Sequence, residues 1–223
     1  PNYGDSSQGI TKDAVVRNQS ALLDNLERLR TEFPRRPVLV QEYLPGAEYS
    51  VSLVGNPDQG LRALPILEVD FSRLDPKLPK ILGYESKWEP DSPYWTQIKY
   101  HEAQLPDHVQ SQMVEHSARL FERLGCRDYA RFDFRADAKG EVRLLEVNPN
   151  PGWCWDGKLN IMAGFAGIRY SELLGQILAA AEERCGIVAK PQVAVAVSGA
   201  SANGSPAHQP ASGNGAGQPV TAG

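Results

Sequence analysis

Residues 129–152 constrain the fold more than any other segment, because their pattern is typical of a β-hairpin whose second strand ends abruptly. In residues 129–152, two apolar-rich runs flank the turn-forming residues Asp137–Gly140. The second run stops at Asn-Pro-Asn-Pro-Gly, residues 148–152. Loops at strand ends are where functional sites are commonly built. The sequence therefore predicts an antiparallel hairpin with a candidate site where its second strand ends.

Alternation along these strands would place several charged residues on one face. If Ala136 pairs with Glu141, Asp133 and Glu146 become diagonal neighbours with backbones about 7–8 Å apart. Two carboxylates that close repel each other unless a cation lies between them. Mg²⁺ prefers carboxylate and amide oxygens, and Asn148 would add a third such oxygen. The shared face would hold Arg131, Asp133, Arg135, Leu144, Glu146 and Asn148.

The apolar neighbours of Glu146 favour a metal site at this position. Glu146 stands between Leu145 and Val147, so we expect its carboxylate to be partly covered and to need a partner. We therefore predict that Asp133, Glu146 and Asn148 bind Mg²⁺, with Mn²⁺ as an alternative ion. The competing interpretation is that these residues are ordinary polar positions on the wet face of a hairpin.

The residues R-F-D-F-R and L-L-E-V-N-P-N-P-G, at 131–135 and 144–152, resemble the metal-binding hairpin of ATP-grasp ligases. The closest similarity is to the D-alanine–D-alanine ligase branch, which shows R-x-D and then E-x-N-x-x-P-G. The resemblance implies an α+β fold of mixed α/β layers, with helices packed on antiparallel sheets. It also implies an ATP- and Mg²⁺-dependent ligase that joins a small carboxylate to an amine through an acylphosphate. Arg131 would be a catalytic, phosphate-binding cation, although a cross-strand pair with Glu146 would also explain it.

The first ten residues, PNYGDSSQGI, resemble the small-residue loop that closes over ATP in this branch. Backbone N–H groups and hydroxyls of such a loop can bind phosphate oxygens, which makes Ser6, Ser7 and Gly9 candidate ATP-binding residues. The alternative is a turn that caps a helix at Thr11. Because the chain begins inside this motif with Pro1, we expect it to be a fragment of a longer protein.

Residues 38–56 are expected to form two strands, the first covered on both faces. They resemble the V-x-E-x-x-x-x-G-x-E pattern of the branch. The resemblance places Glu48 at the ribose hydroxyls, and Gln41, or Glu42 if the register slips by one, beside the adenine. Without the neighbouring matches, Glu48 would be an exposed residue at a strand start.

Tyr84-Glu-Ser-Lys-Trp88 resembles the Y-[DE]-x-K-[YW] segment of the branch, which implies that Lys87 contacts ATP phosphates and acts as a catalytic cation. A solvated loop lysine is the alternative. After Gly152 the chain departs from the family's hydroxyl-rich, substrate-binding stretch. We predict Gly152 and Lys158 as substrate-binding residues, with Lys158 for a carboxylate, and the alternative is two core or lid tryptophans at Trp153 and Trp155.

Apolar periodicity predicts helices over 12–32, 105–125 and 170–185, a strand over 62–72 and an irregular, Pro-rich loop over 74–100. We divide the chain into a central and ATP-lid part (1–104), a carboxyl-terminal ATP-grasp part with the hairpin (105–188) and a disordered tail (189–223). The tail is rich in Ala, Gly, Ser and Pro and cannot bury enough surface to fold.

Composition narrows the partners. The net charge of −4 and the scattered charged residues give no sign of a nucleic-acid or anionic-membrane surface, and no apolar run approaches twenty residues. The three cysteines lack disulfide or zinc spacing, so we expect reduced thiols and a cytoplasmic protein. The oligomeric state stays open, with a homodimer as one option. The rival functions are a non-catalytic nucleotide-binding fragment of a larger protein and a purely structural domain.

Overall fold

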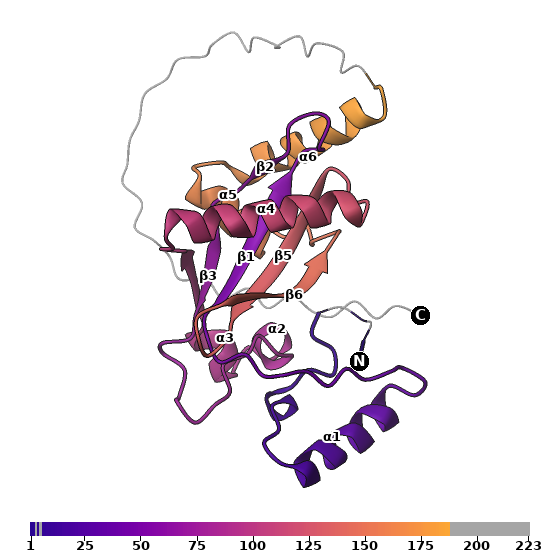
Figure 1. The fold of residues 1–223 in the computed structure, drawn as a ribbon, viewed down its shortest axis with the longest axis vertical. Helices are drawn as coiled ribbons and strands as arrows, with labels where there is room; N and C mark the ends of the chain where they lie inside the picture. The colour runs from indigo at the N-terminus through magenta and orange to yellow at the C-terminus, as the bar shows by residue number, and fades with distance from the viewer. Residues whose placement is uncertain (3, 5, 188–223) are drawn as a thin grey trace, which may run out of the picture. The chain divides into compact units, whose positions relative to one another are not determined.

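A six-stranded antiparallel sheet carries helices on both of its faces (Figure 1). The computed structural model describes residues 1–187 except 3 and 5, so the predicted tail lies outside the described residues. The helices are η1 (Lys12–Ala14, a 3₁₀ turn), α1 (Gln19–Glu32), α2 (Glu85–Trp88), α3 (Pro93–Gln97), α4 (Asp107–Arg123), α5 (Lys158–Phe165) and α6 (Tyr170–Arg184). The strands are β1 (Glu48–Val54), β2 (Arg62–Ala63), β3 (Leu67–Asp70), β4 (Lys99–Glu102), β5 (Tyr129–Ala136) and β6 (Val142–Asn148). Their order is β4-β3-β1-β5-β6, with β2 paired to β1.

The two central strands, β1 and β5, present apolar side chains on one face of the sheet and polar side chains on the other. Tyr49, Val51 and Leu53 of β1 pack in one core cluster with Phe121 of α4, and Phe132 of β5 joins them. Because side chains alternate along a strand, the intervening residues point to the opposite face. There the polar residues are Glu48, Ser50, Ser52, Arg131, Asp133 and Arg135.

Helices α5 and α6 cover part of this second face. Met162 of α5 and Leu173 of α6 are fully buried in a core cluster with Leu67 and Val69 of β3. Burying a large aliphatic side chain contributes about 1.5–3 kcal/mol, so these contacts hold α5 firmly against the sheet. The sheet therefore has a layer of helix on each face, and the polar side chains of β1 and β5 lie beside the amino-terminal end of α5.

The hairpin register differs from the predicted one. Ala136 pairs with Val142 and not with Glu141, because Glu141 belongs to the turn, where the Asp137 carboxylate accepts its N–H. A register shift between Asp133 and Phe134 then adds a β-bulge. Asp133 and Glu146 are therefore directly opposite each other and not diagonal.

The changed register also changes which hairpin residues share a face of the sheet. Leu144 pairs with Phe134, so it does not share the face of Asp133 as predicted. Arg131 pairs with Asn148, so these two do lie on the face of Asp133 and Glu146. Asp133 and Glu146 still lie close together, as predicted, because the changed turn register and the bulge together displace β6 by two residues opposite Asp133.

The segment before β1 is not the covered strand that its apolar residues predict. Residues 38–46 have no regular structure, and Leu39 and Val40 are 59% and 63% exposed. Both edges of β1 are already paired, with β3 and β5. Pro37 and Pro45 also remove backbone donors at both ends of the segment, so the segment does not pair with β1.

Helix prediction succeeded best for the longest amphipathic segments. Helices α4 and α6 match their predicted ranges closely. The first predicted helix instead begins at Gln19, where the Asn18 side chain accepts the Ala21 N–H, and only the short η1 precedes it. The predicted strand over 62–72 is interrupted at Pro65, and the loop that follows it contains α2, α3 and β4. Strands from both predicted parts, 1–104 and 105–188, share this sheet, and the boundary between the parts stays a prediction.

Candidate functional site

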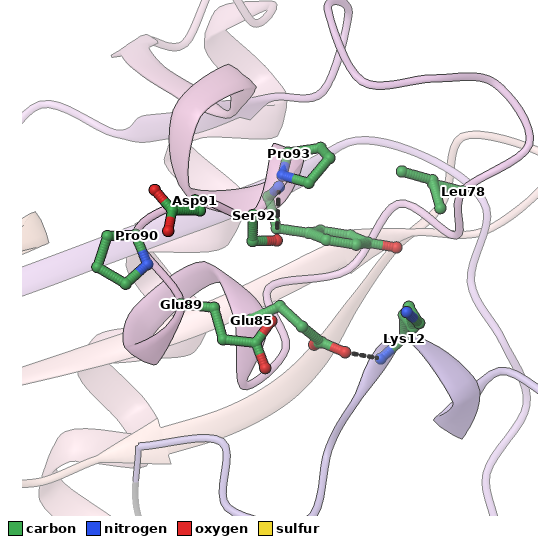
Figure 2. Close-up of a pocket in the computed structure, with 9 residues that line it drawn as sticks. Lys12, Leu78, Glu85, Glu89, Pro90, Asp91, Ser92 and Pro93 are labelled. Atoms are coloured by element: carbon green, nitrogen blue, oxygen red, sulfur yellow. Dashed lines mark hydrogen bonds between the residues drawn. The ribbon is translucent and has the colours of Figure 1, made fainter.

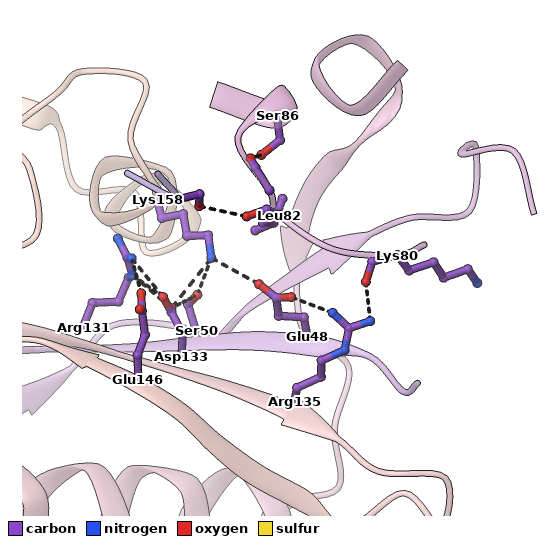
Figure 3. A network of polar contacts seen from close by, with 12 residues as sticks. Glu48, Ser50, Lys80, Leu82, Ser86, Arg131, Asp133, Arg135, Glu146 and Lys158 are labelled. Carbon is purple, nitrogen blue, oxygen red and sulfur yellow. Dashed lines mark hydrogen bonds and ion pairs between the residues drawn. The ribbon is translucent and has the colours of Figure 1, made fainter. Parts of the chain in front are cut away.

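Asp133 lies at the centre of a charged cluster on the α5 face of the sheet (Figure 3). Its side chain is 7% exposed. Arg131 donates from Nε to both carboxylate oxygens, at 2.9 and 3.1 Å, and from Nη2 at 2.9 Å. The Ser50 hydroxyl donates at 2.6 Å. Burial alone would raise the pKa of Asp133, but the charges of Lys158 and Arg131 outweigh it and hold this pKa below its usual range, so the group is a carboxylate at neutral pH.

Glu146 faces Asp133 from the edge strand β6. Its side chain is 64% exposed and its carboxylate lies 3.9 Å from Arg131 Nη2, too far for a hydrogen bond. Its neighbours cover it only in part, because among the described residues β6 has a strand partner on one side only. Desolvation and then the charge of Asp133 raise the pKa of Glu146. A cation between the two carboxylates would relieve that repulsion.

The three predicted metal ligands are brought together at this edge. Asn148 follows Glu146 by two residues on β6, and its Oδ1 accepts the Asn150 N–H at 3.0 Å. Within the described part of the chain, no three or more His, Cys, Asp or Glu side chains cluster as a metal site. Two carboxylates and one amide oxygen fit Mg²⁺, which usually keeps water and takes phosphate oxygens besides protein ligands. Metal binding by these residues stays a prediction.

Glu48 is buried in the same cluster, so the interpretation of an exposed strand start was wrong. Its Oε2 lies 3.0 Å from Arg135 Nη1, directly across the strand pair. Burial is the largest influence and raises the pKa of Glu48, against the opposing charges of Lys158 and Arg135. The predicted contact with a ribose is untested by this geometry.

Arg135 is a member of the cluster to which sequence analysis gave no role. Its guanidinium stacks over the rings of Tyr43 and Phe71, at 5.3 and 5.6 Å, and donates to the Lys80 carbonyl. The signal that could have found it was the alternation R-F-D-F-R, which places Arg135 on the face of Asp133. Its partners lie far away in the sequence, so their identity could not be read from that pattern.

Lys158 enters the cluster from the first turn of α5. Its side chain is 12% exposed, and its ammonium donates to Ser50 Oγ at 3.1 Å. The same nitrogen lies 3.8 Å from Glu48 Oε1 and 3.7 Å from Asp133 Oδ1. Trp153, Trp155 and Gly152, just before it, are exposed, so these tryptophans are not core residues.

Lys87 of α2 completes the group of cations. Desolvation, and then the positive charges of Lys158 and Arg131, lower the pKa of Lys87. Cations from β5 and α5 therefore act on Lys87 beside Asp133 and Glu146. Tyr100 of β4, which sequence analysis missed, lies on the same face, because it pairs with Val69, which pairs with Glu48. Burial and then the charge of Glu48 raise the pKa of Tyr100 to about 12.

The predicted phosphate loop docks against the segment that carries Lys87. The Ser7 hydroxyl donates to the Leu82 carbonyl at 3.0 Å, and Trp88 Nε1 donates to the Ser6 carbonyl at 3.1 Å. Ser6 and Ser7 have φ values of 54° and 58°, in the left-handed region. Such strain is commonly found at ligand-binding segments. Gly9 combines a φ of 78° with a position where a Cβ would come within 2.8 Å of Phe33, so only glycine fits there.

Gln41 and Glu42 lie beside the hairpin, although not on a strand. They line a cavity of about 290 Å³ together with Leu44, Asp137, Arg143, Leu144 and Leu145. Leu144 and Leu145 are half-exposed apolar side chains. A flat aromatic base could pack on them, with an amide and a carboxylate at the rim.

A larger cavity of about 540 Å³ lies at α2 and α3 (Figure 2). Tyr94 and Pro93 form part of its lining, and the Glu85 carboxylate there accepts the Lys12 N–H at 2.8 Å. None of the predicted site residues lines it. Its size alone gives it no chemistry, so the charged cluster remains the candidate site.

The family model for the D-Ala–D-Ala ligase C-terminus matches residues 1–179. The chain belongs to this ligase family. A D-alanine–D-alanine ligase of Bordetella avium is 27% identical over 80% of this chain and 51% of its own length. The vancomycin C-type resistance protein VanC2 of Enterococcus casseliflavus is 27% identical over 82% of this chain and 47% of its own.

Solved structures show the same ATP-grasp ligase fold. D-alanine–D-alanine ligase from Bacillus anthracis complexed with ATP aligns with a TM-score of 0.57 at 23% identity, over 77% of this chain and 50% of that one. The chain thus spans about half the length of the ligases that it matches. No helix among the described residues is long and apolar enough to cross a membrane.

Proposed function

We propose that this protein is the ATP-binding portion of a Mg²⁺-dependent ligase that joins a carboxylate to an amine. The observation that carries the proposal is the facing pair Asp133 and Glu146, set among Arg131, Lys158 and Lys87. Carboxylates for a metal next to cations for phosphates are the parts that phosphoryl transfer requires. Family membership, and the names of the relatives as D-alanine–D-alanine ligases, support the same chemistry.

In the proposed reaction, a substrate carboxylate oxygen attacks the γ-phosphorus of ATP, which gives an acylphosphate and ADP. An amine then attacks the carbonyl carbon, phosphate leaves and the amine loses a proton. Mg²⁺, held by Asp133, Glu146 and Asn148, would supply charge neutralisation for the phosphates. Arg131 presents a planar fork beside that position, and Lys87 presents a point charge.

The remaining predicted contacts concern the nucleotide and the acceptor. Ser6, Ser7 and Gly9 would close over the phosphates from the segment that is docked against α2. Gln41 or Glu42 would bind the adenine edge at the cavity near Leu144 and Leu145. Gly152 would lie with the acceptor, and D-alanine, after which the relatives are named, is the first acceptor to test. A homodimer and a cytoplasmic location remain predictions.

Calorimetric titration of Mg·ATP into the full chain tests the proposal. Glu146→Gln is the sharpest variant, since that side chain is largely exposed and its loss should leave the fold intact. We expect Mg·ATP affinity to fall at least about tenfold, or 1.4 kcal/mol, in Glu146→Gln and in Asp133→Asn. Glu141→Gln, at the exposed turn of the same hairpin, is the matched control and should bind like the wild type. Equal affinity in all four proteins would refute a metal on the hairpin.

The second candidate function is a nucleotide-binding fragment without catalysis. It is favoured by the coverage, because the chain spans about half the length of its relatives. Release of ADP in the presence of D-alanine would support the ligase. Magnesium-dependent ATP binding without ADP release, over a panel of amino acids, would support the fragment.

A further inference from the structure

Each carboxylate near the Lys158 ammonium has an arginine as its nearest ion-pair partner. Glu48 already has Arg135 at 3.0 Å, and Asp133 has the fork of Arg131 at 2.9 Å. Lys158 lies farther from both, at 3.8 and 3.7 Å, and its hydrogen bond goes to the neutral Ser50 hydroxyl. Two carboxylates therefore lie among three cations, Arg131, Arg135 and the mostly buried Lys158, which leaves one positive charge in excess.

Elements next to α5 add to this excess of positive charge. Lys87 carries one further positive charge, and the charges of Lys158 and Arg131 act on it. The three cations come from α5, α2 and β5, so three separate parts of the fold hold them together. Like charges assembled in this way are stable when an anion joins them, as two facing carboxylates are stable with a metal ion.

The position of Lys158 indicates which anion would bind these cations. Figure 3 shows its ammonium between Glu48 and Asp133. Under the proposed function, Glu48 marks the ribose end of the nucleotide and Asp133 marks the metal at the far phosphates. The phosphate chain runs between those two ends. A lysine binds phosphate as a point charge and tolerates several geometries along such a chain.

We propose that Lys158 binds the phosphate chain of the nucleotide and not the carboxylate of the acceptor substrate. This inference rests on the proposed function and adds a phosphate-binding cation from α5 to Lys87 and Arg131. It also makes a distinction that can be measured. A phosphate-binding lysine affects nucleotides in proportion to their phosphates, whereas a lysine for the acceptor leaves nucleotide affinity unchanged.

Calorimetric titration of the full chain with Mg·ADP and with adenosine makes the test. Lys158→Met keeps the apolar stem and removes the charge, and Lys158→Arg keeps a charge. We expect Mg·ADP affinity to fall at least about tenfold in Lys158→Met, to stay within about threefold in Lys158→Arg, and adenosine affinity to be unchanged in both. Lys77→Met, an exposed lysine on the loop after β3, is the matched control.

Each other outcome overturns the inference in a recognisable way. If Lys158→Met binds Mg·ADP like the wild type, Lys158 serves another ligand, and the proposed function stands. If Lys158→Met loses adenosine and Mg·ADP affinity equally, its role is structural. If the wild type binds no Mg·ATP, the proposed function fails together with the inference. Thermal unfolding of each variant shows whether it is folded, and Lys158→Gln repeats the test if Lys158→Met is not.

Discussion

Removing the carboxylate of Glu48 should destabilise the protein strongly, because Glu48 is the counter-charge of a buried arginine. Glu48 Oε2 lies 3.0 Å from Arg135 Nη1, and the side chains are 7% and 5% exposed. In Glu48→Gln, Arg135 keeps the Lys80 carbonyl and the Tyr43 ring but no carboxylate. Breaking a buried pair from one side costs about 3–5 kcal/mol. Because the amide can still accept a hydrogen bond, we expect a loss of about 3 kcal/mol in the free energy of unfolding.

The partner variants test the reasoning further. Arg135→Met should cost less than Glu48→Gln, because Glu48 retains Lys158 at 3.8 Å. The double variant Glu48→Leu/Arg135→Met should recover most of the loss, since apolar replacement of a whole buried pair is often neutral. Urea unfolding followed by circular dichroism gives each free energy. Glu115→Gln, in an exposed pair with Arg119 on α4, is the control and should cost about 0.5 kcal/mol or less. A cost for Glu48→Gln equal to that of the control would refute the argument.

Two further predictions concern stability. The pKa of Asp128 is lowered, chiefly by hydrogen bonds from Arg184. The Asp128 carboxylate therefore contributes fully to the free energy of unfolding above about pH 4. That contribution is lost as the pH falls through the folded-state pKa of Asp128. Asp128→Asn should therefore flatten the acid part of the stability profile, and an unchanged profile in an acid titration followed by circular dichroism would contradict this. Gly46→Ala should cost about 1–3 kcal/mol, because its Cβ would lie 2.6 Å from the Ala136 carbonyl oxygen. Gly140→Ala meets an unfavourable φ of 85° but no steric clash, so it should lower the free energy of unfolding by less in urea unfolding. A larger loss in Gly140→Ala than in Gly46→Ala would contradict the packing argument.

The part of the site that sequence predicted is the part that depends on local geometry. Period-two alternation alone places Arg131 and Asp133 on one face of β5, and the strand after the turn supplies Glu146. The register itself was wrong, because it depends on a turn that includes Glu141 and on a bulge beside Asp133. Bulges are fixed by packing against the rest of the sheet, which a single strand's sequence does not describe.

The contacts that sequence could not predict join distant segments. Ser50 meets Asp133 across 83 positions of the sequence, and Lys158 meets Ser50 across 108. The apolar run Val38–Val40 was expected to be a covered strand, yet both edges of β1 were taken by β3 and β5. Competition for a sheet edge is decided by the whole chain, so local propensity gives no warning of it.

The carboxylates of this cluster are paired with its cations in the free protein, and the proposed ligands would engage the same charges. A metal ion on Asp133 has to replace part of its contact with Arg131 and weaken its attraction to Lys158. Those two cations are then free to interact with phosphate. Conversely, a phosphate that attracts Arg131 and Lys158 leaves Asp133 and Glu146 facing each other with less positive charge between them, which favours a metal ion. Each ligand thus lowers the free-energy cost of binding the other, and thermodynamic linkage makes the effect equal in both directions. Under the proposed function, cooperative binding of metal and nucleotide therefore follows from the ion pairs of the free protein, in addition to any direct attraction between the two ligands.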